Sequence, residues 1–113
     1  MIDDYRFGRI AIDGEAYTKD VILVPGQAPA KWWRRRGHEV CVEDLAVILD
    51  AKPEVFVIGT GAYGRVVVLE EAEEALRQVG ANVVSQPTDD ACKTYDRLLA
   101  EGRRVAAGFH LTC

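Results

Sequence analysis

From residue 43 onward, helical and strand-like segments alternate along the chain. Leu45, Ile48 and Leu49 recur at helical spacing, and Pro53 ends that segment. The apolar run 55–58 has the length and composition of a buried strand. The same order then repeats, with predicted helices over 69–79 and from the N-cap Thr88 to near Gly102, and predicted strands over 82–84 and 105–109. Alternation of this kind favours an α/β domain with a mixed, partly parallel sheet and helices on its faces.

The first 24 residues instead have the character of antiparallel β structure. Apolar side chains are spread over residues 5–12, and the dipeptide Asp13-Gly14 is favoured where a tight turn needs positive φ. A second extended run follows over 17–24, and the loop Pro25–Pro29 ends it. We therefore predict an N-terminal β-hairpin that precedes the alternating part. No repeat, linker or low-complexity tract divides residues 1–113, so we expect one domain.

Composition and charge limit the classes of function. Apolar residues make up 49% of the 113 residues, charged residues 28%, and the net charge is −4. No apolar run reaches the roughly 20 residues of a membrane helix, and no signal segment opens the sequence. The negative charge does not favour nucleic acid as a partner. Three widely spaced cysteines form a poor disulfide framework and indicate reduced thiols, so we expect a cytoplasmic protein.

A glycine-rich loop follows the strand at 55–58. The segment 59–64 matches the dinucleotide pattern G-x-G-x-x-G, but three valines follow where a helix should begin, and no acidic residue ends the next strand. We therefore predict no nucleotide cofactor. Such a loop can still hold an anionic ligand through its amides, and glycine can equally serve backbone geometry alone. The candidate ligand-binding residues are Gly59, Thr60, Gly61, Gly64, Arg65 and Thr88.

Basic and aromatic residues are interleaved over residues 31–38. This cluster suits a protein contact, because Trp and Arg are enriched in binding hot spots. A packing role for one of the tryptophans and stacking on nucleic acid are the alternatives. The candidate partner-binding residues are Trp32, Trp33, Arg34, Arg35 and Arg36.

Two His-x-x-Cys units raise the question of a metal site. His38 with Cys41 and His110 with Cys113 could supply two imidazoles and two thiolates for zinc, but an extended backbone would direct each pair to opposite faces, so we predict no metal. Catalysis by a Cys–His pair needs a third group that orients the histidine. Asp20, Asp44 and Asp96 are available, yet nothing in their spacing pairs any of them with a histidine. No reaction follows from these residues.

Several stretches resemble a known family over essentially the whole chain. They are Phe7-Gly8 with Ile10, Ile12, Asp13-Gly14, Tyr17 and Asp20-Val21; Trp33 with Gly37-His38; Pro53-Glu54 with Val57–Gly61; Thr88, Ala91 and Tyr95; and 102–107 with the closing His110-Leu111-Thr112-Cys113. These stretches resemble the adipogenesis-associated Mth domain-containing family, a domain of unknown function that also includes the mitochondrial complex I assembly factor 3.

The resemblance implies a three-layer α/β fold around a mixed sheet and no established catalytic residues. It also implies Asn at the position where this chain has Asp96. The family's eukaryotic members are associated with assembly and regulation rather than with a defined reaction. Our first hypothesis is therefore a non-enzymatic protein-binding or assembly factor, as monomer or homodimer, that uses the 32–36 cluster. The second is an anionic-ligand site, with or without enzymatic activity, at the glycine loop.

Overall fold

The computed structural model describes all of residues 1–113 and is built around one five-stranded sheet. Strands β10 (Val105–His110), β7 (Val55–Thr60) and β9 (Asn82–Gln86) run parallel, as the alternating pattern predicts. Strand β4 (Val21–Leu23) pairs antiparallel with β10, and β5 (Ala30–Lys31) pairs antiparallel with β4. The order across the sheet is β5-β4-β10-β7-β9, so β10 occupies the centre of a mixed sheet.

The N-terminal residues form a second sheet of three strands rather than a single hairpin. Strands β1 (Ile2–Arg6), β2 (Arg9–Ile12) and β3 (Glu15–Tyr17) pair antiparallel in sequence order. The turn at Asp13-Gly14 was predicted, and both of its residues have positive φ. The turn at Phe7-Gly8 was missed, because one glycine inside an apolar run is a weak signal, although Gly8 also has a positive φ.

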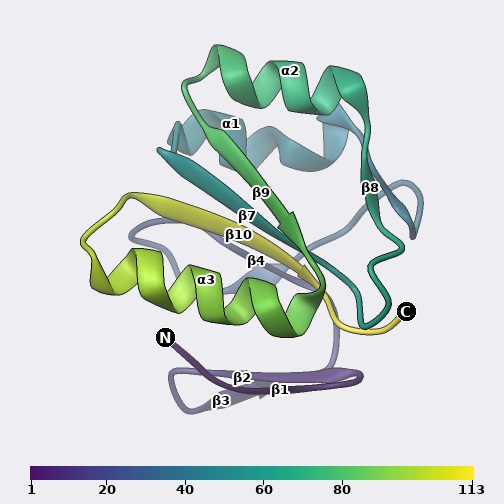
Figure 1. The fold of residues 1–113 in the computed structure, drawn as a ribbon, viewed down its shortest axis with the longest axis vertical. Coiled ribbons are helices and arrows are strands. Elements are labelled where there is room, and N and C mark those ends of the chain that lie inside the picture. The colour runs from purple at the N-terminus through teal and green to yellow at the C-terminus, as the bar shows by residue number, and fades with distance from the viewer.

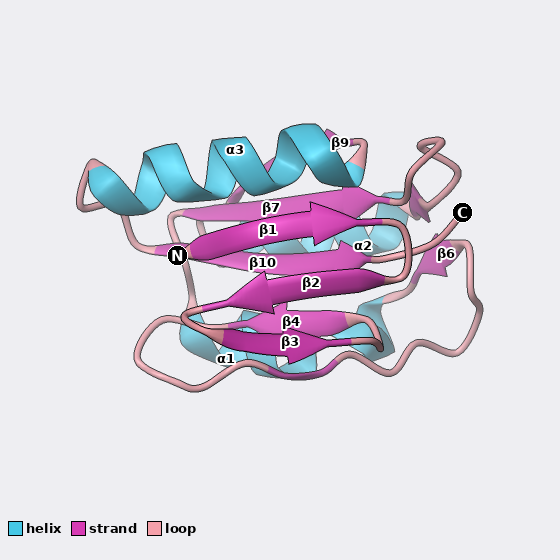
Figure 2. Cartoon of the chain, turned by 90° about the horizontal axis from the view of Figure 1, so that it is seen from below, coloured by secondary structure: helices cyan, strands magenta, loops and turns pink.

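The helices lie on both faces of the five-stranded sheet (Figure 1). The segment predicted as one helix from residue 43 is a 3₁₀ turn over Val42–Leu45 followed by α1 (Ala46–Ala51). Helices α1 and α2 (Glu70–Gln78) share one face, and a short parallel pair, β6 (Glu39–Val40) with β8 (Val67–Val68), leads into α2. Helix α3 (Thr88–Ala100) covers the other face beside the N-terminal sheet (Figure 2).

The alternation of side chains along β7 divides the core in two. Val55 and Val57 pack with α3 and the N-terminal sheet, whereas Phe56 and Ile58 pack with α1 and α2. Asp96 of α3 accepts a hydrogen bond from the Ile2 amide at 2.8 Å, and this bond fastens the N-terminal sheet to the helix. The three layers implied by the family resemblance are therefore present. None of the helices has the length and apolar character of a membrane span.

The parallel strands end at one edge of the sheet, where the C-terminus lies (Figure 2). Three loops meet the C-terminal segment there. The Gly8 amide donates to Leu111 O and the Ala62 amide donates to Thr112 O, each at 2.8 Å, while Arg34 reaches His110 from the loop after β5. This edge of the molecule is the place where residues far apart in sequence come together.

Candidate functional site at the end of strand β10

The site is built on a contact between His110 and Asp20. Strand β4 pairs antiparallel with β10 so that Val21 lies opposite Phe109, which places Asp20 beside His110. The Asp20 Oδ2 atom lies 2.7 Å from His110 Nδ1, and its Oδ1 accepts the Leu111 amide at 2.9 Å. Since an ionised carboxylate only accepts hydrogen bonds, Nδ1 carries the proton and donates it to Asp20. The remaining ring nitrogen, Nε2, lies 3.5 Å from Thr112 Oγ1.

Arg34 completes the charge network. Its Nη2 atom donates to Asp20 Oδ2 at 2.9 Å and to Gly37 O at 2.8 Å. The same Nη2 is 3.1 Å from His110 Nδ1, but both nitrogens carry protons, so this is a close approach of two donors toward one carboxylate oxygen. The negative charge of Asp20 is thus shared between a guanidinium and an imidazole.

The guanidinium of Arg34 lies in the interior. The side chain is 4% exposed, and its Nε and Nη1 atoms are buried without a hydrogen-bond partner. Its carbon Cζ lies 4.6 Å from the centre of the Trp32 ring, which provides a cation–π contact where hydrogen bonds are missing. Burial of an arginine is tolerated here because Asp20 pairs with its charge.

The surroundings of Asp20 act on its pKa in opposite directions. Burial alone would raise it, whereas the hydrogen bonds from His110 and the Leu111 amide, together with the charges of His110 and Arg34, lower it. The net effect holds the pKa of the Asp20 carboxyl below its ordinary value. Asp20 is therefore a fixed negative charge that orients the imidazole.

Asp44 holds the loop that carries Arg34. Its backbone oxygen accepts Trp32 Nε1–H at 3.0 Å, and its carboxylate accepts the Arg35 amide at 3.1 Å and the Cys41 amide at 2.8 Å. Sequence reasoning placed Asp44 in the first turn of a helix, where it does lie, but its bonds to this loop were not foreseen. Residues 32–41 are consequently attached to the α1 side of the sheet.

A hollow of about 320 Å³ lies beside the imidazole. His110 and Thr112 line it from the C-terminal segment, Thr18, Lys19 and Asp20 from the turn before β4, and Lys31 from β5. A second hollow of about 300 Å³ adjoins it and shares Thr18, Lys19, Asp20 and Lys31. Each volume lies at the lower end of the range for small-molecule sites, about 300–1,000 Å³.

The glycine loop uses its amides inside the protein. The Gly61 amide donates to Thr88 Oγ1 at 2.9 Å, and the Thr88 hydroxyl donates to His110 O at 2.6 Å. Thr88 is fully buried, and its hydroxyl joins the loop to β10. Contrary to our expectation, it does not cap α3 and does not face solvent. A Cβ on Gly59 would lie 2.8 Å from Phe109, which explains the glycine through close packing.

The remaining loop residues lie in different surroundings. Thr60 is buried and donates to Gln86 O at 3.0 Å, Gly64 has a positive φ, and Arg65 is exposed beside the Tyr63 ring. None of the five hollows in the protein is lined by residues 59–65. The Gly61 amide at the centre of the predicted anion loop is thus already bonded to Thr88, and no cavity lies beside the loop.

The basic and aromatic cluster is divided between the interior and the surface. Trp32 is buried, and a Cβ on Gly108 would lie 2.5 Å from its ring. Arg34 is buried beside it, so neither residue is available to a partner, contrary to our expectation. Trp33, Arg35 and Arg36 are exposed. Interleaved residue types on a short segment do not reveal which side chains turn inward.

The comparisons with known proteins agree with this architecture. Residues 2–110 match the family described as "Protein of unknown function (DUF498/DUF598)". The chain belongs to the DUF498/DUF598 family. A human relative, "NADH dehydrogenase [ubiquinone] 1 alpha subcomplex assembly factor 3", is 32% identical over 110 residues, which cover 94% of this chain. The chain spans 58% of the length of that relative.

Solved structures share the DUF498/DUF598 fold. A conserved hypothetical protein from Pyrococcus horikoshii OT3 superposes with a TM-score of 0.91 at 27% identity, covering 100% of this chain and 99% of the other. A Bordetella pertussis protein described as a Mth938-like domain superposes with a TM-score of 0.76 at 22% identity, over 97% of this chain and 84% of the other. The resemblance drawn from the sequence motifs is confirmed, and the three-layer fold is the fold of the family.

The two histidines of this DUF498/DUF598 domain lie side by side. Their ring centroids are 5.8 Å apart, and the rings are nearly perpendicular. No group of three or more His, Cys, Asp or Glu side chains gathers closely enough to hold a metal ion. Cys41 and Cys113 are half-buried, and Cys92 lies on the buried face of α3, in the core.

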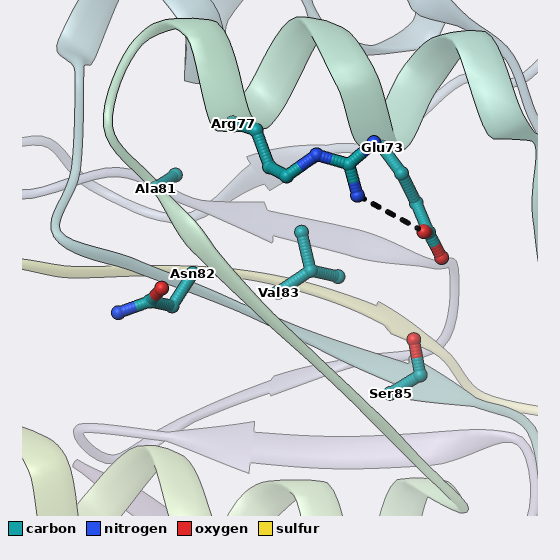
Figure 3. Close-up of a pocket in the computed structure, with 6 residues that line it drawn as sticks. All are labelled: Glu73, Arg77, Ala81, Asn82, Val83 and Ser85. Atoms are coloured by element: carbon teal, nitrogen blue, oxygen red, sulfur yellow. Dashed lines mark ion pairs between the residues drawn. The ribbon is translucent and has the colours of Figure 1, made fainter.

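The largest hollow of the domain lies elsewhere, between α2 and the edge strand β9, with a volume of about 380 Å³ (Figure 3). Glu73 and Arg77 extend over it from α2, and Val83 and Ser85 line it from β9. The Arg77 guanidinium is paired with Glu74 at 2.6 Å and with Glu73 at 3.8 Å. The charged side chains that line this hollow are therefore already paired at the surface.

Sequence reasoning missed the Asp20–His110 pair and the placement of Lys19 and Lys31 beside it. Asp20 and His110 are 90 residues apart, and although both fall in stretches that resemble the family, nothing in those stretches pairs them. The available signal was the pairing of two apolar strands, 21–24 and 105–109, whose antiparallel register brings these residues together. That register cannot be read from either strand alone.

Proposed function

We propose that this domain is a non-enzymatic protein-binding factor that serves the assembly of a larger complex. The observation that carries the proposal is the exposure of three aromatic side chains, Phe7 (57%), Trp33 (69%) and Tyr63 (71%). Phe7 and Tyr63 lie on loops that are hydrogen-bonded to the C-terminal segment, and Trp33 lies on the loop whose Arg34 pairs with Asp20. Exposed tryptophan and tyrosine side chains on rigid supports are typical of interfaces, because they provide large contact area at low entropic cost.

The supports of these side chains are firm. Phe7 precedes Gly8, whose amide is bonded to Leu111, and Tyr63 follows Ala62, whose amide is bonded to Thr112. Trp33 lies between the buried residues Trp32 and Arg34. A partner would therefore meet a preformed surface, which lowers the cost of ordering on binding.

The charges nearby indicate the chemistry of the partner. Arg35 and Arg36 follow Trp33 by two and three residues, and Arg65 lies beside Tyr63. Arg35 and Arg36 are bound to Glu43 and Glu39 in exposed ion pairs, which a partner can replace at little cost. We therefore expect a protein surface that combines apolar side chains with carboxylates.

The comparisons support this proposal through the human relative, whose name describes an assembly factor. Its similarity to this chain extends over 94% of the chain, so the domain described here corresponds to a large part of that protein. An assembly role for this chain is the inference we draw from that similarity.

The test is affinity capture from the native host with a tagged chain. Trp33→Ala and Tyr63→Ala remove exposed aromatic groups, and Arg35→Glu reverses an exposed charge two residues after Trp33. Leu99→Ala is the control for the apolar changes, since Leu99 is exposed on α3. Arg97→Glu is the control for the charge, because Arg97 and Arg35 are about equally exposed and each pairs with one glutamate.

We expect a defined polypeptide to be captured by the wild type and both control variants and to be lost with Trp33→Ala and Arg35→Glu. A partner that both variants retain at full strength would contradict the proposal. Circular dichroism and thermal unfolding of each variant show whether the loss reflects the surface or the fold.

A further inference from the structure

We propose that the two adjoining hollows beside His110 bind a small phosphorylated compound, with its phosphate group at Lys19, Lys31 and His110. This inference is independent of the protein-binding function, since it uses neither Trp33 nor Tyr63. It is carried by a cavity, by unpaired positive charge and by an oriented imidazole that occur together.

The first observation is the unpaired charge. Lys19 and Lys31 both line the hollows, and neither ammonium has a carboxylate within 4.0 Å, although most other cationic side chains of the protein do. Asp20 also lines the hollows, but both its oxygens are engaged by Leu111, His110 and Arg34. The hollows therefore carry an excess of positive charge, which favours an anionic ligand.

The second observation is the orientation of His110. Its Nδ1–H is held by Asp20, so the tautomer and the direction of the ring are fixed. The opposite nitrogen, Nε2, is left for other partners, with the Thr112 hydroxyl at 3.5 Å. Nε2 accepts a hydrogen bond from the hydroxyl of a monoprotonated phosphate when the ring is neutral and donates one to the dianion when the ring is charged. Thr112 and Thr18 add hydroxyl donors at the same hollow.

The third observation concerns the class of anion. Two lysines and an imidazole together match the double negative charge of a phosphate monoester better than the single charge of a carboxylate. The adjoining hollow is lined by Ala16, Tyr17 and Val21 as well as the shared polar residues. Its apolar part is suited to the organic portion of such an ester, while the phosphate occupies the hollow at His110.

The test is a titration of the untagged protein with inorganic phosphate and with glycerol phosphate, followed by NMR of the histidine ring nitrogens. Sodium chloride at equal ionic strength is the control for screening, and acetate is the control for carboxylates. We expect saturable shifts of His110 Nε2 with both phosphates and none with chloride. Tighter binding of glycerol phosphate assigns the site to an ester, and equal binding assigns it to free phosphate.

Variants locate the binding. Lys19→Ala and Lys31→Ala change exposed residues, and each should weaken phosphate binding about tenfold, the effect of losing one charge-assisted contact. Lys93→Ala is the matched control, because Lys93 is exposed on α3 outside both hollows. Unshifted His110 resonances in saturating phosphate would overturn the proposal. Equal weakening by Lys93→Ala and Lys31→Ala would overturn it as well, since the binding would then be nonspecific.

Discussion

The Nδ1 atom of His110 lies 2.7 Å from Oδ2 of Asp20, and this contact joins the last residue of the central strand to the residue that precedes β4. The buried guanidinium of Arg34 closes on the same carboxylate oxygen at 2.9 Å. A buried arginine depends on its carboxylate, so the pair determines both the geometry of the imidazole and the stability of this edge of the sheet. We make four predictions, which concern Asp20, the two tryptophans, Thr88 and Cys92.

Replacing Asp20 by Asn should destabilise the protein most at neutral pH. The change leaves the charge of Arg34 buried without its partner, at a cost of about 3 kcal/mol in the free energy of unfolding. The pKa of Asp20 is lowered in the folded state, so the contribution of its charge is fully present above the ordinary value of 3.8 and is lost as the pH falls through the lower, folded value.

Urea unfolding of wild type and Asp20→Asn at a series of pH values checks this expectation. The difference between the two proteins should be largest near neutral pH and should shrink below the ordinary aspartate pKa of 3.8. A difference that is independent of pH would show that the carboxylate charge is not what stabilises this edge.

The neighbouring tryptophans should differ sharply in their contribution to stability. Trp32 is buried against Phe56 and Arg34, so Trp32→Ala should cost about 3–5 kcal/mol. Trp33 is exposed, so Trp33→Ala should change the free energy of unfolding by less than about 0.5 kcal/mol. Denaturant unfolding measures both, and equal losses would mean that Trp33 also packs in the folded protein.

The hydroxyl group of Thr88 should stabilise the folded protein. Thr88→Val keeps the shape but leaves His110 O and the Gly61 amide without their shared partner, at a cost of about 2 kcal/mol or more. Thr88→Ser keeps the hydroxyl and loses one buried methyl group, at about 1 kcal/mol. If thermal unfolding ranks valine as more stable than serine at this position, the hydroxyl is not the stabilising group.

Cys92 should be the least reactive thiol of the folded protein. Burial, followed by the charges of Asp96 and Asp89, raises the pKa of Cys92 to about 12. Near pH 8 only about one thiol in 10⁴ at this position would be ionised, and the thiolate is the reactive form. Labelling with a thiol reagent, followed by peptide mass spectrometry, should therefore modify Cys92 after Cys41 and Cys113.

Denaturation in urea provides the control for this labelling experiment. All three thiols should then react at similar rates, because unfolding removes the burial that protects Cys92. Rapid modification of Cys92 in the absence of urea would show that α3 opens from the sheet under native conditions.

The arrangement of strands and helices was accessible from the sequence because it depends on near neighbours. The period of apolar residues identified β7, β9, β10 and all three helices, and Asp13-Gly14 identified a turn. The 3₁₀ turn before α1 and the turn at Phe7-Gly8 were missed. At these places the local preference is weak, and the geometry follows from packing onto the sheet.

The candidate site was decided by the tertiary structure alone. Asp20 and His110 meet because β4 pairs antiparallel with β10 in one register, and that register is fixed by the burial of both strands between two layers of side chains. The same burial turned Trp32 inward and left Trp33 at the surface. The sequence by itself thus determined which segments are strands and helices and the family of the chain. Packing between segments distant in sequence determined which charged groups share one site, because local residue patterns carry no information about that pairing.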